Sequence, residues 1–590
     1  MMTVEKLITD HIDTWSSALQ TRSTAGRGSN GKIDLYGIKK LRELILELAV
    51  RGKLVPQDPN DEPASELLKR IASEKAQRVK EGQIKKQKPL PPVSDDEKPF
   101  DLPEGWEWCQ LQTITSKITD GDHKTPARIS DGYKLMSAKN VRDGYIDYDN
   151  CDYISEVDYI KSRERCLPEI GDLLIVSVGG TIGRSSLIRE SADFALVRSV
   201  AIIKPLLFDS NYLKLSMDSF LLQGFIHETK RGGAQPCLYL SEITKFLFPM
   251  PPEKEQKRIV CKVNELMSLC DQLEQQSLTS LDAHQQMVET VLASLTSSKS
   301  AEELAENWAR ISHHLDTLFT TEASIDALKQ TILQLAVMGK LVPQDPNDEP
   351  ASELLKRIEQ EKAQLVKEGK IKKQKPLATV SEEDKPFESP EGWKWCRFED
   401  IVDIQSGITK GRNLVGRVLI SVPYLRVANV QRGFLDLSDI KTIEIPADEK
   451  DKYHVKSNDL LITEGGDWDT VGRTAIWTDS SFYIANQNHV FKARPINNEL
   501  NVRWLEIFMN SSVSRDYFAG ASKQTTNLAS INKTQLRGCL IAMPPVNETA
   551  RILEMYLSLI NVCETLKSHL QSTQQTQLYL ADALTDAALK

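Results

Sequence analysis

A stretch of 24 residues occurs twice in this chain with a single difference. It reads LAVRGKLVPQDPNDEPASELLKRI from Leu48 and LAVMGKLVPQDPNDEPASELLKRI from Leu335, an offset of 287 positions in a chain of 590. A repeat this close at half the length of the chain indicates two similar halves in one polypeptide. Such a chain corresponds to a fused dimer and suits a target that has two related parts.

Composition limits the class of protein. With 40% hydrophobic and 27% charged residues, the chain has the composition of a folded globular protein rather than of a disordered or fibrous one. It contains no apolar run of about 18 residues, and its N-terminus lacks the apolar core of a signal peptide. We therefore expect a cytoplasmic protein with no membrane-spanning part.

The cysteines and the net charge further limit which kinds of protein this chain can be. Nine cysteines include no CxxC pair and no Cys/His cluster, which argues against a disulfide framework and against structural zinc. The formal net charge of −9 gives no overall attraction to nucleic acid. Any DNA binding must therefore rest on local basic groups or on the surface of a partner.

Helical patterns surround the duplicated stretch. Apolar residues at helical spacing predict a helix that leads into each copy, through Ile38, Leu41, Ile45 and Leu48, and through Ile325, Leu328, Ile332 and Leu335. Two long helices are predicted after proline pairs, and each carries an apolar run spaced 4-3-4-3. The runs are Ile259, Val263, Leu266, Cys270 and Leu273, and, 293 positions later, Ile552, Tyr556, Leu559, Cys563 and Leu566. We expect the two runs to pack on each other as an antiparallel coiled coil; core helices in separate bundles are the alternative.

Two regions between the helical parts differ most between the halves. Their apolar residues alternate, and glycine, aromatic and β-branched residues are frequent, as in strands. A common skeleton remains, since GDLLIVSVGGTIGR parallels NDLLITEGGDWDTVGR and SAKNVRDGYID parallels RVANVQRGFLD. We call residues 106–252 and 390–545 the first and second variable domains, and expect one α/β or mainly β fold for both.

The resulting fold class is α+β. Two tandem α/β domains are joined by duplicated helical regions, and the halves are related by a pseudo-two-fold internal repeat. The boundaries are 1–105 for an N-terminal helical region with a linker, 106–252 and 390–545 for the variable domains, 253–389 for a central helical spacer and docking region, and 546–590 for a C-terminal long helix.

Motifs for catalysis are missing from the sequence. The glycine-rich turns at 179–183 and 465–472 lack the spacing of a GxGxxG or Walker loop, and a β-hairpin turn explains them better. The Asn/Asp-Pro-Pro-aromatic motif of a base methyltransferase is absent. The nine histidines form no metal or triad pattern. We therefore expect no catalytic residue, no metal site and no cofactor in this chain.

What remains is recognition by polar side chains on the variable domains. Arg, Lys, Asn and Gln can grip phosphates or read base edges in a groove. In the first variable domain the candidates are Lys117, Thr119, Asp120, His123, Lys124, Thr125, Lys139, Asn140, Arg142, Arg184, Lys230, Arg231 and Gln235. In the second they are Lys410, Arg412, Arg417, Arg426, Asn429, Gln431, Arg432, Arg473, Asn486, Gln487, Asn488, Lys523, Gln524 and Thr525. Ordinary surface decoration is the alternative for each residue alone.

Across almost its whole length, the chain resembles the DNA-specificity subunit of a type I restriction-modification enzyme. The resemblance lies in the TDGDHKTP loop, the two paired segments quoted above, and the MPP helices that lead into LCDQLEQQ and VCETLKSH. The duplicated GKLVPQDPNDEPASELL is similar to the longer form of that family. No single motif is specific, but their duplicated order is.

The resemblance implies a division of labour. Each variable domain would be a target recognition domain that reads one half of an asymmetric, split site in double-stranded DNA. The helical regions would hold the domains apart and dock modification subunits, usually two, which carry S-adenosylmethionine and methylate adenine. Restriction subunits would use ATP and magnesium to translocate and cleave. The alternative function is a duplicated, non-catalytic scaffold that binds proteins through its variable domains.

The duplicated stretch itself is not expected to read DNA. Two nearly identical copies cannot distinguish two different half-sites, so we expect each copy to offer the same docking surface. Substitutions at Leu48, Leu54, Leu335 or Leu341 should then impair folding or assembly and leave the target sequence unchanged.

Overall fold

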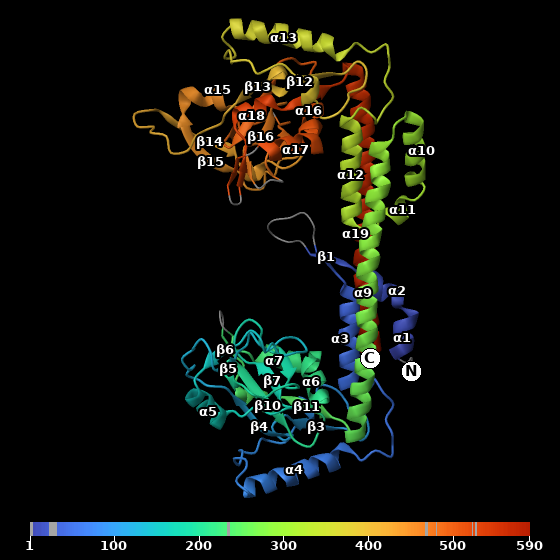
Figure 1. The fold of residues 1–590 in the computed structure, drawn as a ribbon, viewed down its shortest axis with the longest axis vertical. Coiled ribbons are helices and arrows are strands. Elements are labelled where there is room, and N and C mark those ends of the chain that lie inside the picture. The colour runs from blue at the N-terminus through green and yellow to red at the C-terminus, as the bar shows by residue number, and fades with distance from the viewer. Residues whose placement is uncertain are drawn as a thin grey trace. The chain divides into compact units, whose positions relative to one another are not determined.

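A computed structural model describes residues 4–22, 32–232, 236–466, 470–479, 481–521, 523–525 and 528–589 (Figure 1). The chain divides into two compact units. Unit 1 comprises Met1–Ser280 with Thr573–Lys590, and unit 2 comprises Leu281–Ser572. Each unit contains one variable domain and one copy of the duplicated stretch.

Both variable domains are built on the same four-stranded antiparallel sheet. In the first the strand order is β4 (Thr115–Asp120), β10 (Val200–Pro205), β7 (Leu173–Val176) and β8 (Ser185–Leu187). In the second it is β13 (Val402–Gln405), β20 (Val490–Pro495), β16 (Leu460–Thr463) and β18 (Thr474–Ile476). The quoted LLIV and LLIT segments are the matching strands β7 and β16, in which all four residues are buried. The expectation of one fold for both domains is therefore confirmed.

Smaller sheets complete each domain. A three-stranded sheet contains one parallel pair in each case: β6 (Asp152–Ile154), β5 (Tyr133–Met136) and β9 (Ala195–Leu196), or β15 (Lys441–Pro446), β14 (Leu419–Leu425) and β19 (Ala485–Asn486). The first and last strands of each domain pair with each other, as β3 (Glu107–Gln110) with β11 (Leu247–Met250), and β12 (Lys394–Arg397) with β23 (Leu540–Met543). Both ends of each domain thus lie together.

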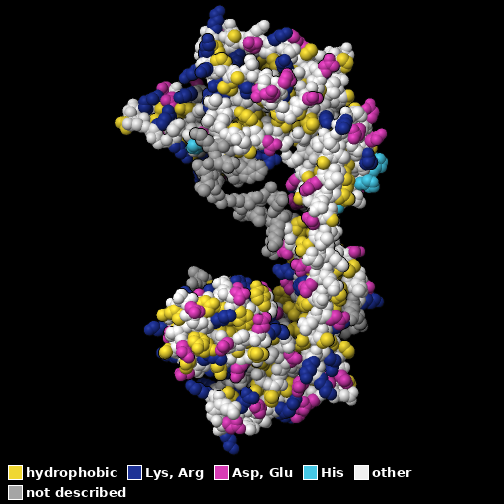
Figure 2. All heavy atoms as spheres, in the orientation of Figure 1, with side chains coloured by type: hydrophobic (Ala, Val, Ile, Leu, Met, Phe, Trp, Pro, Cys, Tyr) yellow, Lys and Arg dark blue, Asp and Glu magenta, His cyan; other side chains and the backbone are white. Residues whose placement is uncertain are grey.

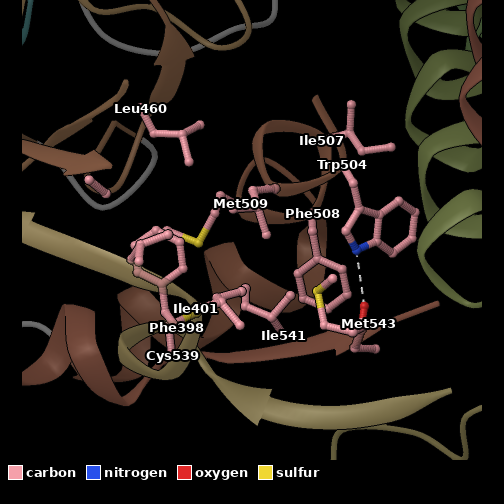
Figure 3. Close-up of a cluster of buried hydrophobic side chains, with 14 of the residues drawn as sticks. Phe398, Ile401, Leu460, Trp504, Ile507, Phe508, Met509, Cys539, Ile541 and Met543 are labelled. Atoms are coloured by element: carbon pink, nitrogen blue, oxygen red, sulfur yellow. Dashed lines mark hydrogen bonds between the residues drawn. The ribbon is translucent and has the colours of Figure 1, made fainter. Parts of the chain in front are cut away.

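Short helices cover these sheets. The first variable domain has α5 (Glu156–Arg165), α6 (Ser210–Asp218), α7 (Phe220–Thr229) and α8 (Leu240–Ile243). The second has α14 (Phe398–Ile401), α15 (Lys450–Tyr453), α16 (Val502–Met509), α17 (Ser512–Ala521) and α18 (Lys533–Gly538), with extra strands β17 (Gly465–Gly466), β21 (Lys523–Thr525) and β22 (Leu528–Ser530). In both domains the closing strand accepts a hydrogen bond from a buried aromatic side chain. Trp504 Nε1 donates to Ala542 O at 3.1 Å, amid Phe508, Ile541 and Met543 (Figure 3), and Tyr212 Oη donates to Pro249 O at 2.9 Å.

The predicted helix before each duplicated stretch is present in both units. These are α3 (Tyr36–Val50) and α12 (Glu322–Val337), and all eight apolar residues predicted for them are buried. The long helices are α9 (Glu253–Ser297) and α19 (Val546–Leu589). Further helices are α1 (Val4–Asp10), α2 (Ile12–Ser17), α4 (Ala64–Lys80), α10 (Ala301–Ser312), α11 (Leu315–Leu318) and α13 (Ala351–Lys367), with a short strand pair of β1 (Gln20–Arg22) and β2 (Lys32–Asp34). None of the described helices combines the length and apolar character that a membrane span needs.

In unit 2, α12 packs with parts of both long helices in one hydrophobic cluster (Figure 1). Lys329 donates to Glu564 at 2.8 Å and Gln571 to Glu322 at 3.0 Å, so α19 runs antiparallel to α12. The C-terminal part of α9 runs the other way, since His284 bonds to Leu318 O and Lys340 Nζ, beyond the end of α12, donates to Thr296 O. The expected antiparallel arrangement of α9 and α19 is therefore found within this unit.

The residues that make this packing are not the ones expected. Four residues of the apolar run of α19, from Tyr556 to Leu566, pack in one cluster with α12 and with Val288 and Leu292 of α9. The run of α9 lies in unit 1, where α3 packs beside it and Arg42 donates to Asp271 at 2.7 Å. Each run is thus paired with the repeated helix of its own half, and the expected pairing of the two runs with each other was wrong. Spacing alone defines an apolar stripe but not its partner.

The duplicated stretch fixes the geometry around each long helix. After the left-handed Gly52 (φ 67°) and Gly339 (φ 69°), which end the preceding helices, a glutamine turns back to bond the glycine carbonyl. The same side chains, Gln57 and Gln344, also donate to Glu255 and Glu548, each at 3.2 Å. Leu48, Leu54 and Leu335 are buried, and Leu341 is half-buried against the core.

A substitution in the duplicated stretch should affect stability. Leu335→Ala removes a side chain that is 2% exposed and leaves a cavity, so we expect the free energy of unfolding to fall by about 2–5 kcal/mol. Leu437→Ala, at a position 44% exposed, should change it by less than about 0.5 kcal/mol. Chemical denaturation measures the free energy of unfolding of both variants. Equal effects would contradict a structural role for Leu335.

A lysine with a lowered pKa is buried in the second variable domain at a place where the first has an isoleucine. Lys492 in β20 is 1% exposed, and its Nζ donates to His454 O at 2.8 Å. Burial lowers the pKa of Lys492 from 10.5 to about 8. At the matching place in β10, 290 positions earlier, stands Ile202.

This lysine should make stability depend on pH. Between about pH 8 and 10.5 the folded Lys492 is neutral while the unfolded one is protonated, so the unfolded state binds more protons and stability rises with pH. Lys492→Met should reduce that slope by up to about 1.4 kcal/mol per pH unit, and the exposed-site control Lys441→Met should leave it unchanged. Denaturation series at several pH values test this, and an unaltered slope in Lys492→Met would count against it.

Candidate nucleic-acid interface

In the second variable domain, loops gather at one end of the four-stranded sheet. Because neighbouring strands are antiparallel, β13 and β16 end where β20 and β18 begin. Backbone hydrogen bonds join the loops there, from Asn488 N to Ile408 O at 2.9 Å and from Glu464 N to His489 O at 2.9 Å. We call this the loop end of the domain; it comprises residues 406–418, 426–433, 464–466, 470–473 and 486–489.

The first variable domain has the same arrangement. Asp122 N donates to Leu196 O at 2.8 Å, and Ser177 N donates to Ser199 O at 2.9 Å. Its loop end comprises residues 121–132, 137–142, 177–184 and 197–199. The sheet thus brings together loops that are far apart in the sequence, which a base-reading surface requires.

A glycine allows the first loop to cross at each loop end. A Cβ on Gly121 would lie 2.0 Å from Leu196 O, and one on Gly407 would lie 2.1 Å from Asn486 O. Only glycine lets the backbone pass this closely. The two contacts are equivalent, so the frame that carries the loops is the same in both domains.

Most of the predicted recognition residues lie on these loops or beside them. In the first domain they are His123, Lys124, Thr125, Lys139, Arg142 and Arg184, with Lys230 and Arg231 on the neighbouring segment that bridges to residue 237. In the second they are Lys410, Arg412, Arg417, Arg426, Gln431, Arg432, Arg473, Gln487 and Asn488. None of these side chains is fully buried.

Several of the arginines are held by carboxylates of their own domain. Arg417 lies 2.6 Å from Asp448, Arg426 lies 2.8 Å from Asp439, and Arg412 lies 2.9 Å from Glu449. On the visible face, basic and acidic side chains are accordingly mixed (Figure 2). A phosphate would have to replace a carboxylate at these arginines, which limits the attraction that the loop ends offer to DNA.

Three predicted asparagines are structural and are withdrawn as DNA contacts. Asn140 and Asn429 are buried, and each accepts a backbone N–H at 2.9 Å, from Ser137 and Arg426, and donates to carbonyl oxygens farther along its loop. Asn486 is also buried and donates to Val490 O at 2.6 Å. Sequence pattern does not separate an asparagine that holds a loop from one that reads a base, because the loop needs the same donors and acceptors.

Three further residues belong to β4 rather than to a loop. Lys117 lies in mid-strand and donates to Arg165 O at 2.6 Å, and Thr119 follows in the same strand. Asp120 is buried and accepts from Arg165 at 2.6 Å and from His123 at 3.1 Å. Asp120 therefore positions His123. Gln235 lies outside the described residues, as do the side chains of Lys523, Gln524 and Thr525, whose backbone forms β21.

Sequence reasoning missed Arg198. It is exposed at the loop end of the first domain, in the turn between β9 and β10. The signal was available, because Arg198 stands 290 positions before Asn488, which was predicted. Alignment of the paired strands, rather than of the loops, would have found it.

Metal-binding groups and reactive thiols are features that would support metal or covalent chemistry. No group of three His, Cys, Asp or Glu side chains among them could hold a metal ion. Burial raises the pKa of the Cys109 and Cys539 thiols to about 12, so neither is a thiolate at neutral pH. What the loop ends present is a set of hydrogen-bond donors and acceptors.

Comparison with known proteins agrees with this geometry. The model of the type I restriction modification DNA specificity domain matches residues 127–283 and 390–573. The chain belongs to the family of type I restriction enzyme specificity subunits. The resemblance noted in the sequence and the α+β fold with an internal repeat are confirmed.

Two relatives of this specificity subunit match along the full length. It is 47% identical to the type I restriction enzyme EcoEI specificity subunit and 48% identical to the EcoAI specificity subunit, both of Escherichia coli, with 100% of each chain covered. A chain from a solved type I R-M system is 18% identical, with 83% of this chain and 99% of that chain covered and a TM-score of 0.45.

The structural role of Asn429 can be tested in the specificity subunit. Asn429→Ala leaves the backbone N–H of Arg426 and the carbonyl of Asp436 without their partner, so we expect a loss of about 1–3 kcal/mol in local stability. Hydrogen exchange of amides 426–439 should accelerate. Asn498→Ala, at an exposed position, is the control, and equal exchange in both variants would contradict the role.

Proposed function

We propose that this specificity subunit binds a bipartite, asymmetric site in double-stranded DNA, with one half read by each variable domain. The observation that carries the proposal is the pair of loop ends, which share one frame and differ in their side chains. Arg198 and Arg142 at the first, for instance, correspond to Asn488 and Gln431 at the second. An identical frame with different readers suits two different half-sites.

The chemistry is assigned to partner subunits. Modification subunits that hold S-adenosylmethionine would methylate adenine, and restriction subunits that use ATP and magnesium would cleave, in the cytoplasm where the DNA lies. This chain would supply recognition and no catalytic residue. The ion-paired arginines of the second domain and the net charge of −9 support weak, salt-sensitive DNA binding until partners complete the complex.

The long helices carry candidate docking surfaces. Leu269 and Met287 on α9 are 42% and 45% exposed, and 293 positions later Val562 and Leu580 on α19 are 45% and 50% exposed. The two residues of each helix are 18 positions apart, or five turns, and so face the same side. Unit 1 holds Leu269 with Leu580, and unit 2 holds Val562 with Met287. A matched pair of apolar side chains in each unit fits two copies of one modification subunit.

Exchange of a variable domain tests the recognition model. When residues 390–545 are replaced by the same region of another specificity subunit, we expect one half of the methylated site to change and the other half to persist. Mapping of methylated adenines by single-molecule sequencing, with modification subunits co-expressed, gives the result. The reciprocal exchange of residues 106–252 should change the other half. A protein scaffold would leave the site unchanged in both exchanges.

Charge placed on the docking surfaces tests assembly. Leu269→Glu with Leu580→Glu should cost the complex one modification subunit, and so should Val562→Glu with Met287→Glu, because each buries a charge at an apolar contact. Native mass spectrometry counts the subunits. Leu278→Glu is the matched control, since Leu278 is 44% exposed but corresponds to Gln571 in the other helix. A full complement of subunits in both double variants would exclude these surfaces.

A further inference from the structure

Arg198 and Asn488 occupy the same turn in the two variable domains. Arg198 N donates to Asp122 O at 3.0 Å, and Asn488 N donates to Ile408 O at 2.9 Å. The turn closes in the same way in both, from Val200 N to Val197 O at 3.0 Å and from Val490 N to Gln487 O at 2.9 Å. A backbone fixed at both points sends the two side chains out from equivalent places.

Neither side chain has a partner among the described residues, in contrast to several other polar side chains at the loop ends. At the first loop end, Arg184 lies 3.6 Å from Asp143, and Arg142 lies 3.8 Å from Asp147. Arg198 is exposed and has no such carboxylate within the described part of the chain. Asn488 is half-exposed, and its side-chain carboxamide makes no hydrogen bond to a described residue. The carboxamides of Asn429 and Asn486, in contrast, donate to backbone carbonyls. Arg198 and Asn488 are thus each an available donor group on a fixed turn.

We propose that Arg198 and Asn488 are the specificity-determining residues of one equivalent position in the two half-sites, Arg198 reading a guanine and Asn488 an adenine. The assignment rests on the proposed function. A guanidinium donates two parallel hydrogen bonds to guanine O6 and N7, and a carboxamide pairs with adenine N6 and N7. The two residue types therefore read different bases from one backbone position.

A phosphate contact explains the pair less well. The uncharged amide of Asn488 gains far less from a phosphate than a guanidinium does. A position kept for phosphate would favour a basic residue in both halves, because the DNA backbone is the same in both half-sites. An arginine in one domain and an asparagine at the same position of the other therefore fit the reading of two different bases better than contact with phosphate.

The test uses the full complex of this chain with its modification subunits. Methylation is measured on DNA libraries in which each position of the site is randomised in turn. In the Arg198→Asn complex, preference for guanine at one position of one half-site should fall by about tenfold or more, with the other positions unchanged. In the Asn488→Arg complex, preference for adenine should fall similarly at one position of the other half.

Arg189→Asn is the control, because Arg189 is exposed beyond the opposite end of β8 and bonds to Asn211. The inference is overturned if Arg198→Asn leaves every preference unchanged, or if it lowers methylation of all sequences equally, as loss of a phosphate contact would. Failure of the proposed function is recognised separately, since the unaltered complex would then show no bipartite site.

Discussion

A buried carboxylate at the start of each long helix joins that helix to the duplicated stretch and to the variable domain of the same half. Glu255 accepts hydrogen bonds from Trp106 Nε1 at 3.1 Å and from Gln57, and Glu548 accepts them from Trp393 Nε1 at 3.0 Å and from Gln344. Burial raises the pKa of both carboxyls, so the donors must offset a desolvation cost. Three segments meet at this group: the duplicated stretch, the residue just before the first strand of the variable domain, and the long helix. The orientation of each variable domain on its own helix depends on that meeting point.

The contacts around this carboxylate are repeated in both halves, whereas the side chains at the loop ends are not. The contacts around Glu255 and Glu548 agree within 0.1 Å, and the crossing glycines at the loop ends are equivalent. The side chains at equivalent positions of the two loop ends, in contrast, are of different types. Folding requires the first set to be alike, while the proposed reading of two different half-sites requires the second set to differ. The near-identity of the duplicated stretch is therefore a mark of structure rather than of recognition.

Local pattern in the sequence predicted the elements well and their partners less well. The helix through Ile38, Leu41 and Ile45 and the strands in LLIV and LLIT follow from spacing and composition alone. The partners of the two apolar runs were wrong, because an apolar stripe is equally satisfied by any helix of complementary shape. Asn140, Asn429 and Asn486 were misread because polarity in a loop does not reveal whether its hydrogen bonds are already made internally. Arg198 becomes apparent only when strands β10 and β20 are aligned, because the turns before these strands differ in sequence.

The division of the chain into units has a consequence for biosynthesis. Unit 1 includes Thr573–Lys590, and Tyr36 near the N-terminus donates to Asp582 at 2.7 Å. The helical packing of unit 1 therefore cannot be completed until residues 573–590 have been synthesised. A nascent chain that holds only the first half exposes the face of α3 that α19 will cover. Truncation near the C-terminus acts on the N-terminal half, although more than 500 positions of sequence lie between them.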